Sequence, residues 1–124
     1  MSTPSLPPAI EQQYKRLQQL SSQIRVLQTQ LSQLELQLRD TENALKELGN
    51  IGEGASVYKN VGMLLFKSEV PKLSEELSDK KETLDLRVKT LQKQEERARK
   101  KFEELRERLS KQLQTFQEEG RIAG

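Results

Sequence analysis

A heptad repeat of apolar residues, beginning at Ile10 and ending at Leu48, constrains the fold more than any other feature of the sequence. One apolar series recurs every seven residues, and a second series follows three residues behind it. The first series is Ile10, Leu17, Ile24, Leu31, Leu38 and Leu45, and the second is Leu20, Leu27, Leu34 and Leu48, with polar Gln13 and Thr41 at two further positions. These are the a and d positions of a coiled-coil helix. The repeat predicts a helix over residues 9–48, and one such helix cannot bury its own apolar stripe.

A second heptad repeat predicts another long helix over residues 71–118. Pro71 suits the first turn, because the N–H that proline lacks would have no partner there. The repeat contains Leu77, Leu84, Leu91, Ala98 and Leu105, with Val88, Phe102, Leu109 and Phe116 as the companion series and with Lys81 and Glu95 as interruptions. Acidic residues precede basic ones by four positions in the pairs Asp85–Lys89, Glu95–Arg99, Glu96–Lys100, Glu104–Arg108 and Glu107–Lys111. Such pairs are typical of a solvated helix face.

The connection between the two predicted helices favours folding the second helix back on the first. A helix of about 40 residues is about 60 Å long, and residues 49–70 are all that joins the two. An antiparallel two-helix coiled coil is the simplest arrangement that buries both apolar stripes. If Leu48 lies level with Leu73, then Ile10 lies level with residue 111. Both termini are therefore expected at the end opposite the connection.

The connection begins with a glycine-containing segment, residues 49–56, which predicts a flexible connector. Gly49 is typical of the left-handed residue that ends a helix. Glycines also occur in phosphate-binding loops, but such a loop needs Lys followed by Ser or Thr after the last glycine, and then a helix. Ala55, Ser56 and a β-like run follow here. The segment is therefore not interpreted as a nucleotide site.

Residues 57–67, VYKNVGMLLFK, predict a β-hairpin because β-forming residues lie on both sides of Gly62. The strands are expected at 57–61 and 63–67, with apolar residues on both faces. A two-stranded hairpin is of marginal stability alone in water, and its unpaired edges favour further pairing. The hairpin either caps the coiled coil or joins neighbouring subunits in a shared sheet or barrel, and we favour assembly. The residues expected to carry assembly are Val57, Tyr58, Val61, Met63, Leu64, Leu65 and Phe66.

Composition argues against several classes of function for this chain of 124 residues. It contains no cysteine, which favours a reducing compartment, and no histidine, the commonest general base and metal ligand. We therefore expect no enzyme, no catalytic or metal site and no cofactor. No apolar run reaches the roughly 18 residues of a membrane helix, and the N-terminus lacks the features of an export signal. The chain is expected to be cytoplasmic and to have no membrane partner.

The heptad helix, the connector, VYKNVGMLLFK and the charged segment SEELSDKKETLDLRVKTLQKQEERARKK together resemble the beta class of prefoldin subunits, in particular the archaeal type. The resemblance covers roughly residues 9–116. It implies a single prefoldin-like domain, residues 1–124, that is mainly α, with hairpins joined into an oligomeric β-barrel platform. It further implies a hexamer of two alpha and four beta subunits, which holds unfolded polypeptide without ATP and transfers it to a group II chaperonin. Residues 1–8 and 119–124 are expected to be flexible, and the chain ends match no pattern of the family.

The resemblance implies that unfolded clients bind at the end that carries both termini. The candidate residues there are Leu6, Ile10, Tyr14, Leu17, Leu109, Leu113 and Phe116. Four of these occupy heptad positions and are alternatively core residues, namely Ile10, Leu17, Leu109 and Phe116. Leu6, Tyr14 and Leu113 lie off the strict stripe and are the better candidates for client contact.

Two other functions stay open at the level of sequence, an RNA-binding coiled-coil arm and a structural tether. RNA binding would use the cations of the second helix, Arg97, Arg99, Lys100, Lys101, Arg106, Arg108 and Lys111. Glutamates are interleaved with these cations, and no aromatic residue is placed for base stacking. Nucleic acid binding is therefore disfavoured, and its steep salt dependence would distinguish it from apolar capture.

Overall fold

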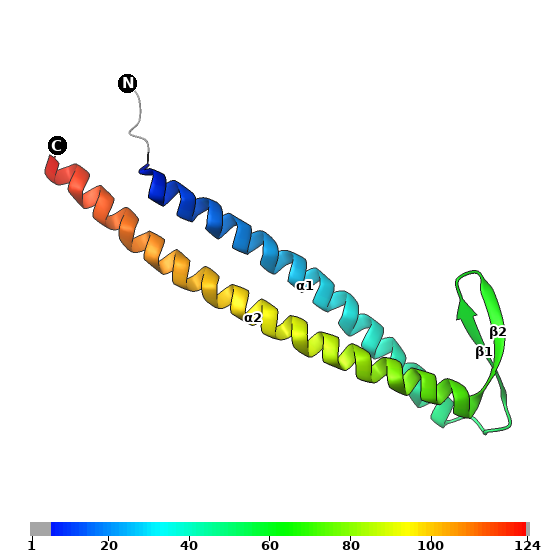
Figure 1. Cartoon of the computed structure of the whole chain (residues 1–124). Helices are drawn as coiled ribbons and strands as arrows, with labels where there is room; N and C mark the ends of the chain where they lie inside the picture. Colours follow the sequence, from blue (N-terminus) through cyan, green and yellow to red (C-terminus); the bar gives the residue numbers. More distant parts are fainter. Residues whose placement is uncertain (1–5, 124) are drawn as a thin grey trace. The chain divides into compact units, whose positions relative to one another are not determined.

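The chain forms two long helices joined by a β-hairpin (Figure 1). Helix α1 spans Pro8–Gly49 and helix α2 spans Val70–Ala123. Between them, strand β1 covers Ser56–Val61 and strand β2 covers Leu64–Glu69. This computed structural model describes residues 6–123, with side chains described up to residue 120. Because the two helices pack antiparallel and a two-stranded hairpin joins them, the predicted mainly α coiled-coil fold is confirmed. The oligomeric β-barrel stays a prediction.

The chain divides into two compact units. The terminal unit comprises residues 1–29 and 92–124, and the hairpin unit comprises residues 30–91. Each unit contains a stretch of both helices, and the hairpin belongs to the hairpin unit. The sequence predicted one domain for the whole chain. Two units form because residues of an antiparallel helix pair contact only residues at the same level, so the pair has no single centre.

The buried residues follow the predicted heptads and form a seam between the helices in each unit. The buried apolar residues are Ile10, Leu20, Leu27 and Leu48 in α1 and Leu84, Val88, Ala98 and Leu109 in α2, together with Val70 at the start of α2. Thr41 is the one polar residue among the buried ones in the described part of the chain. Its hydroxyl donates to the Gln37 carbonyl at 2.8 Å, so its burial leaves no unpaired hydroxyl.

The helix ends differ slightly from those predicted. Helix α1 begins one residue earlier, where the amides of Ile10 and Glu11 donate to the Pro7 carbonyl. Gly49 is the last helical residue and is not left-handed, because Gly62 has the only positive φ among the described residues. Neither helix, over its described residues, contains a stretch apolar enough to cross a membrane.

Helix α2 continues to Ala123, beyond the predicted end at residue 118. Residues 119–123, expected to be a flexible tail, are therefore helical. Gly120 costs a helix only about 1 kcal/mol relative to alanine, and no proline follows to stop it. The predicted flexible segment at the other end lies largely outside the described residues, which begin at Leu6.

The hairpin has six residue pairs, from Ser56 opposite Glu69 to Val61 opposite Leu64. Its loop is therefore the two residues Gly62 and Met63. Gly62 has a φ of 60°, and no other described residue has a positive φ. A two-residue loop with glycine in this conformation at its first position is a type II′ turn, which matches the right-handed twist of paired strands. The second strand was predicted to begin at residue 63, but Met63 belongs to the turn, and the strand runs on to Glu69.

Candidate functional site

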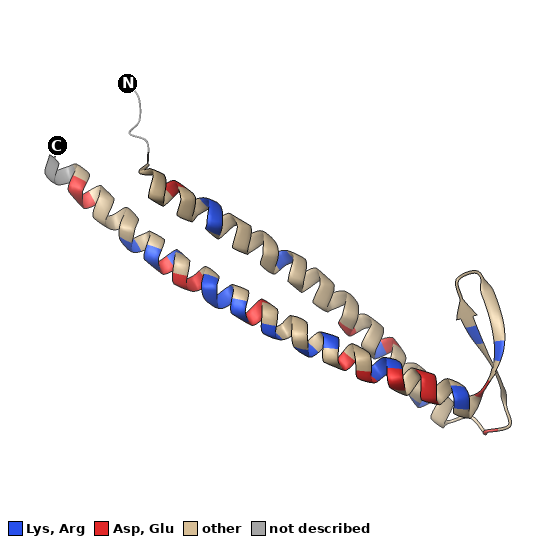
Figure 2. Cartoon of the chain, in the orientation of Figure 1, with Lys and Arg blue, Asp and Glu red and all other residues tan. Residues whose placement is uncertain are grey.

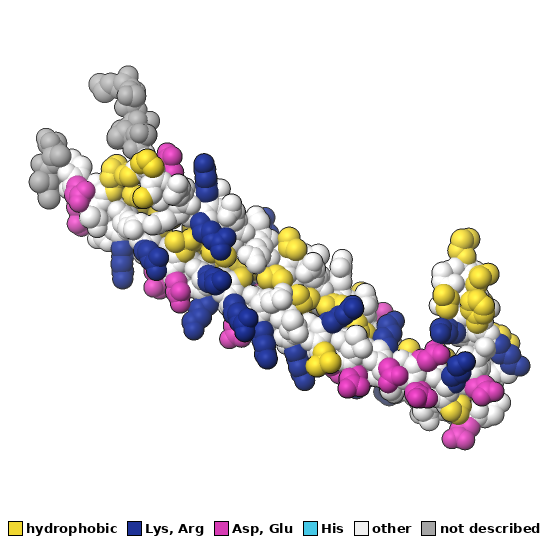
Figure 3. Space-filling model, viewed as in Figure 1, with side chains coloured by type: hydrophobic (Ala, Val, Ile, Leu, Met, Phe, Trp, Pro, Cys, Tyr) yellow, Lys and Arg dark blue, Asp and Glu magenta, His cyan; other side chains and the backbone are white. Residues whose placement is uncertain are grey.

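The hairpin presents the largest set of exposed apolar side chains in the described part of the chain (Figure 3). This hairpin surface comprises Tyr58, Val61, Met63, Leu64, Leu65 and Phe66, each at least 50% exposed. Met63, at the turn, is 101% exposed and has no neighbours to pack against. A cluster of this kind on a soluble protein marks an interaction site.

The pairing of the strands places apolar residues on both faces of the hairpin. Residues directly opposite each other in an antiparallel pair lie on the same face. The first face carries Val57, Lys59 and Val61 from β1 with Leu64 and Phe66 from β2. The second face carries Tyr58 and Asn60 with Leu65 and Lys67. The sheet contains only these two strands, so among the described residues each strand has one unpaired edge.

The base of the hairpin is attached to α2. The ammonium nitrogen of Lys59 lies 2.9 Å from a carboxylate oxygen of Glu76. Both side chains are about 40% exposed, at 43% and 39%, so solvent screens this ion pair and its net stabilisation is below about 1 kcal/mol. Val57 is half-buried and Val70 is buried. The hairpin is therefore held at its base, while its outer part packs against nothing within the described chain.

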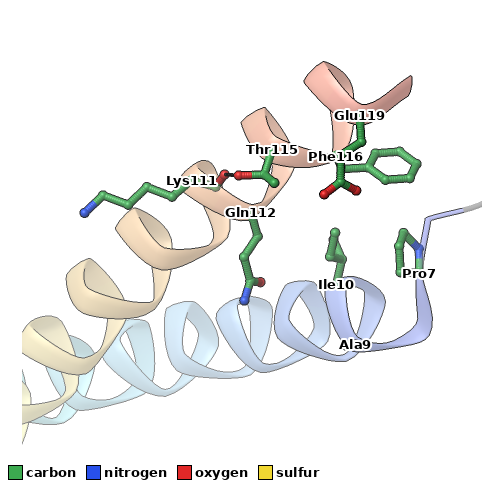
Figure 4. Close-up of a pocket in the computed structure, with 8 residues that line it drawn as sticks. All are labelled: Pro7, Ala9, Ile10, Lys111, Gln112, Thr115, Phe116 and Glu119. Carbon is green, nitrogen blue, oxygen red and sulfur yellow. Dashed lines mark hydrogen bonds between the residues drawn. The ribbon is translucent and has the colours of Figure 1, made fainter. Parts of the chain in front are cut away.

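A second apolar surface lies in the terminal unit, where α1 begins and α2 approaches its end. An open groove of about 360 Å³ is lined by Pro7, Ala9, Ile10, Lys111, Gln112, Thr115, Phe116 and Glu119. Figure 4 shows Ile10 on α1, and Pro7 just before α1, directed toward α2, where Phe116 lies. Ile10 lies beside Lys111 and Gln112, as the predicted antiparallel register required. We call this the terminal groove.

The candidate client-binding residues have different environments in the structure. Ile10 and Leu109 are 6% and 3% exposed and belong to the seam, although Ile10 also lines the terminal groove. Tyr14 is 38% exposed. The remaining four candidates, Leu6, Leu17, Leu113 and Phe116, are half-buried. The structure therefore brings only Ile10 and Phe116 together in the groove.

Sequence reasoning missed several residues that line the terminal groove, including Pro7, Gln112 and Thr115. The signal for Gln112 was present, because it stands seven residues after Leu105 and continues the heptad series. The position of Pro7 and Thr115 in the groove can be inferred only after the register has placed Ile10 beside Gln112. Thr115 donates its hydroxyl hydrogen bond to the Lys111 carbonyl at 3.0 Å, so this hydroxyl is engaged within α2.

Two glutamines interrupt the apolar seam of the terminal unit. Gln13 stands at a predicted d position, and Gln112 lies in the groove with its amide directed toward α1 (Figure 4). The Oε1 atoms of both are buried and have no hydrogen-bond partner among the described residues. A buried acceptor without a partner costs about 1–3 kcal/mol. The polar groups of the seam are therefore less well satisfied at the end of the terminal unit than in the leucine layers further along, which contain no side-chain acceptors.

Comparisons with known proteins agree on one family. The sequence model of the prefoldin subunit family matches residues 11–116. The chain is 44% identical over 108 residues to the prefoldin subunit beta of Archaeoglobus fulgidus, covering 87% of this chain and 93% of that protein. It is 40% identical over 111 residues to the prefoldin subunit beta of Methanosarcina barkeri, covering 90% and 95%.

A solved structure has the same fold. The crystal structure of the prefoldin beta subunit from Thermococcus strain KS-1 matches with a TM-score of 0.80 and 30% identity, covering 90% of this chain and 97% of that one. An antiparallel helix pair that carries an unpaired hairpin defines a coiled-coil subunit built to join other chains. The chain belongs to the prefoldin subunit family, a family of chaperones, and it is similar throughout to beta subunits.

Proposed function

We propose that this chain is a subunit of an ATP-independent holdase that captures unfolded polypeptides at the ends of its coiled coils. Capture prevents the aggregation of the client, and the complex transfers the client to a group II chaperonin. The chain acts in the cytoplasm within a hexamer of two alpha and four beta subunits. It contributes its hairpin to the platform of the hexamer and its terminal unit to client binding.

The terminal groove is the observation that carries this proposal. Pro7, Ile10 and Phe116 give it an apolar lining, and it is open to solvent. Its walls are helices, whose backbone groups are already hydrogen-bonded within the helix, so only side chains are available to a ligand. Contacts of this kind depend on apolar area rather than on a particular sequence. The groove is therefore suited to unfolded segments of many sequences.

The hairpin surface supports assembly. Two strands with open edges and exposed apolar residues on both faces are not stable as an independent sheet. Neighbouring strands would satisfy the free backbone groups and cover residues such as Leu64 and Phe66, which are 62% and 50% exposed. The coiled coils would then be held on one platform, and several weak client contacts would act together.

A triple substitution at the end of the terminal unit tests the proposed function. Tyr14→Ser, Leu113→Ser and Phe116→Ser together remove apolar groups at or next to the groove. The complex assembled with an alpha subunit should then fail to suppress the aggregation of a denatured test protein, measured by light scattering. Circular dichroism and native mass spectrometry verify that helices and assembly are retained.

The matched control replaces three other exposed apolar residues with serine. Val26, Leu36 and Leu86 are 55%, 56% and 61% exposed and lie away from the groove-lining set. This control complex should protect the test protein as well as the unmodified complex does. Full protection by the groove variant, or equal loss in both variants, contradicts capture at the terminal groove.

A further inference from the structure

The two units differ in charge. The terminal unit contains 12 Lys and Arg against 8 Asp and Glu, whereas the hairpin unit contains 9 against 11. Most of the cations of the terminal unit belong to α2, as Figure 2 shows. An excess of positive charge attracts anionic partners, provided that the cations are not already neutralised by neighbouring carboxylates.

The cations on the two sides of the terminal seam have different neighbours. On one side, a groove of about 220 Å³ is lined by Arg16, Leu20, Gln23, Gln94, Arg97, Ala98 and Lys101. On the other side, a groove is lined by Ser21, Ile24, Arg25, Gln28, Arg99, Phe102 and Glu103. Since successive residues turn by about 100° around a helix, Arg97 and Lys101 lie on one flank of α2 and Arg99 and Glu103 on the other. We call the first of these the cationic groove.

Carboxylates neutralise the cations only on the second side. Arg99 lies 2.7 Å from Glu95, and Arg106 lies 2.8 Å from Glu103. Glu95 also accepts a hydrogen bond from Gln28 at 3.4 Å, so this half-buried carboxylate is held by both helices. No carboxylate lines the cationic groove.

In the described part of the chain, the cationic groove therefore combines cations that have no carboxylate partner with buried apolar residues at its bottom. Within the described residues, none of its three cations, Arg16, Arg97 and Lys101, takes part in an ion pair. Its floor is formed by Leu20 and Ala98, which are 3% and 4% exposed and belong to the seam. The cationic side chains come from both helices, so an anionic ligand lying in the groove would contact α1 and α2 together.

We propose that the cationic groove binds acidic stretches of extended polypeptide. Carboxylates of the ligand pair with Arg16, Arg97 and Lys101, and arginine in particular offers paired donors that fit a carboxylate. The amides of Gln23 and Gln94 both donate and accept, which suits a peptide backbone with its N–H and C=O groups. This inference rests on the proposed function, because the natural ligand is an acidic segment of an unfolded client.

A peptide fits this groove better than a nucleic acid. Binding to single-stranded nucleic acid relies on aromatic side chains that stack on the bases, and no aromatic residue lines the cationic groove. The groove therefore extends the client range of the terminal unit from apolar segments to segments rich in Asp and Glu.

Two charge-matched variants of the full-length chain test the inference. The groove variant combines Arg16→Gln, Arg97→Gln and Lys101→Gln. The control variant combines Arg25→Gln, Arg99→Gln and Arg106→Gln, which removes the same charge from the other side of the seam. The probes are fluorescein-labelled peptides of alternating Glu and Gly and of alternating Gln and Gly, and a labelled single-stranded oligouridylate, followed by fluorescence anisotropy.

The unmodified chain should bind the Glu peptide more tightly than the Gln peptide and the oligouridylate, and added salt should weaken this binding. Because each exposed ion pair contributes only modestly to affinity, the loss of all three should make the groove variant bind the Glu peptide about tenfold more weakly. The control variant should retain most of the affinity. Equal losses in the two variants would show a general charge effect and overturn the inference. Tighter binding of the oligouridylate would overturn it in favour of a nucleic acid site.

Failure of this inference and failure of the proposed function have different signatures. The complex that contains the groove variant should still suppress the aggregation of a test protein that lacks acidic stretches, because the terminal groove is unchanged. If the unmodified complex protects that protein and yet the chain does not bind the Glu peptide, the holdase function stands and the cationic groove is not a peptide site. If the complex protects no test protein, the proposed function itself fails.

Discussion

The terminal unit and the hairpin unit both expose apolar side chains, but they expose the backbone differently. In the terminal groove, Ile10 and Phe116 lie on helices whose N–H and C=O groups are hydrogen-bonded internally. In the hairpin, Leu64 and Phe66 lie on strands that each have a free edge. Backbone edges require a partner strand in a defined register, whereas side chains alone accept any apolar segment. The difference is the basis for proposing a fixed partner for the hairpin and variable partners for the terminal unit.

The seams of the two units also differ, in how completely their polar groups are hydrogen-bonded. The buried polar residue of the hairpin unit, Thr41, has its hydroxyl bonded to the Gln37 carbonyl at 2.8 Å. The polar seam residues of the terminal unit, Gln13 and Gln112, have buried acceptors without partners. The hairpin unit is therefore the better satisfied of the two. Unpartnered polar groups in the terminal seam agree with the proposal that this end of the chain accommodates ligands of many shapes.

The largest expected effect is the loss of the assembly that we propose for the hairpin. Leu64→Asp with Phe66→Asp places two carboxylates on one face, where burial against a neighbouring sheet would leave both charges without partners. Native mass spectrometry of the chain mixed with an alpha subunit should show that the oligomer is lost. Circular dichroism should show the helices unchanged.

Leu36→Asp with Leu86→Asp is the matched control for that experiment, because both residues are exposed apolar positions outside the hairpin. This control should assemble normally. An oligomer of native size from the hairpin variant would mean that the hairpin is not the assembly element.

Substitution of one seam leucine in each unit compares the units directly. Leu20 in the terminal unit and Leu84 in the hairpin unit are both 3% exposed. Removing such a side chain leaves a cavity and costs about 2–5 kcal/mol of unfolding free energy. Leu20→Ala should fall at the lower end of this range, since Leu20 lines an open groove whose exposed side chains can move into the cavity. Urea denaturation at one fixed protein concentration measures both, and a larger loss for Leu20→Ala would contradict the difference in packing.

A smaller effect of opposite sign is expected at the polar seam positions. Gln112→Leu removes a buried acceptor that has no partner and should raise the unfolding free energy by about 1–3 kcal/mol. Thr41→Val removes a hydroxyl that is already bonded and should change the stability little or lower it. Thermal denaturation of the two variants at equal concentration tests the contrast. Destabilisation by Gln112→Leu would show that the Gln112 amide is satisfied in solution.

The smallest effect concerns the ion pair at the base of the hairpin. Lys59→Met keeps the length of the side chain and removes its charge, so it breaks the 2.9 Å contact with Glu76. Because both groups are substantially exposed, the unfolding free energy should fall by less than about 1 kcal/mol. Glu76→Gln is the partner control, and a double-mutant cycle isolates the pair. A coupling energy well above that bound would mean that the ion pair sets the position of the hairpin.

Sequence reasoning recovered the fold because the decisive signals are local and periodic. The heptads from Ile10 to Leu48 predicted α1 within one residue at each end, and VYKNVGMLLFK predicted the hairpin and the faces of its strands. The turn was shifted by one residue because glycine and Met63 together form the type II′ loop. The end of α2 was missed because residues 119–123 carry no strong signal for either helix or coil.

The grooves were harder to predict, because each is shared between the two helices. Nothing in the sequence near Arg16 indicates that it lies in one groove with Arg97 and Lys101. The spacing of charges was also a weak guide to ion pairs. Of the five predicted pairs, all within the described residues, only Glu95–Arg99 is formed, and Arg106 pairs with Glu103 at a spacing of three. Exposed side chains adopt many rotamers at similar energy, so spacing alone does not decide which pair forms.

Site-specific photocrosslinking tests client capture by the terminal unit most directly. A photoreactive phenylalanine analogue is placed at Phe116 in one variant and at Leu86, exposed in the hairpin unit, in another. Each variant is assembled with an alpha subunit, mixed with a denatured test protein and irradiated. The client should be crosslinked through position 116 and not through position 86. Crosslinking mainly through position 86 would place client capture in the hairpin unit and contradict the division of roles between the two units.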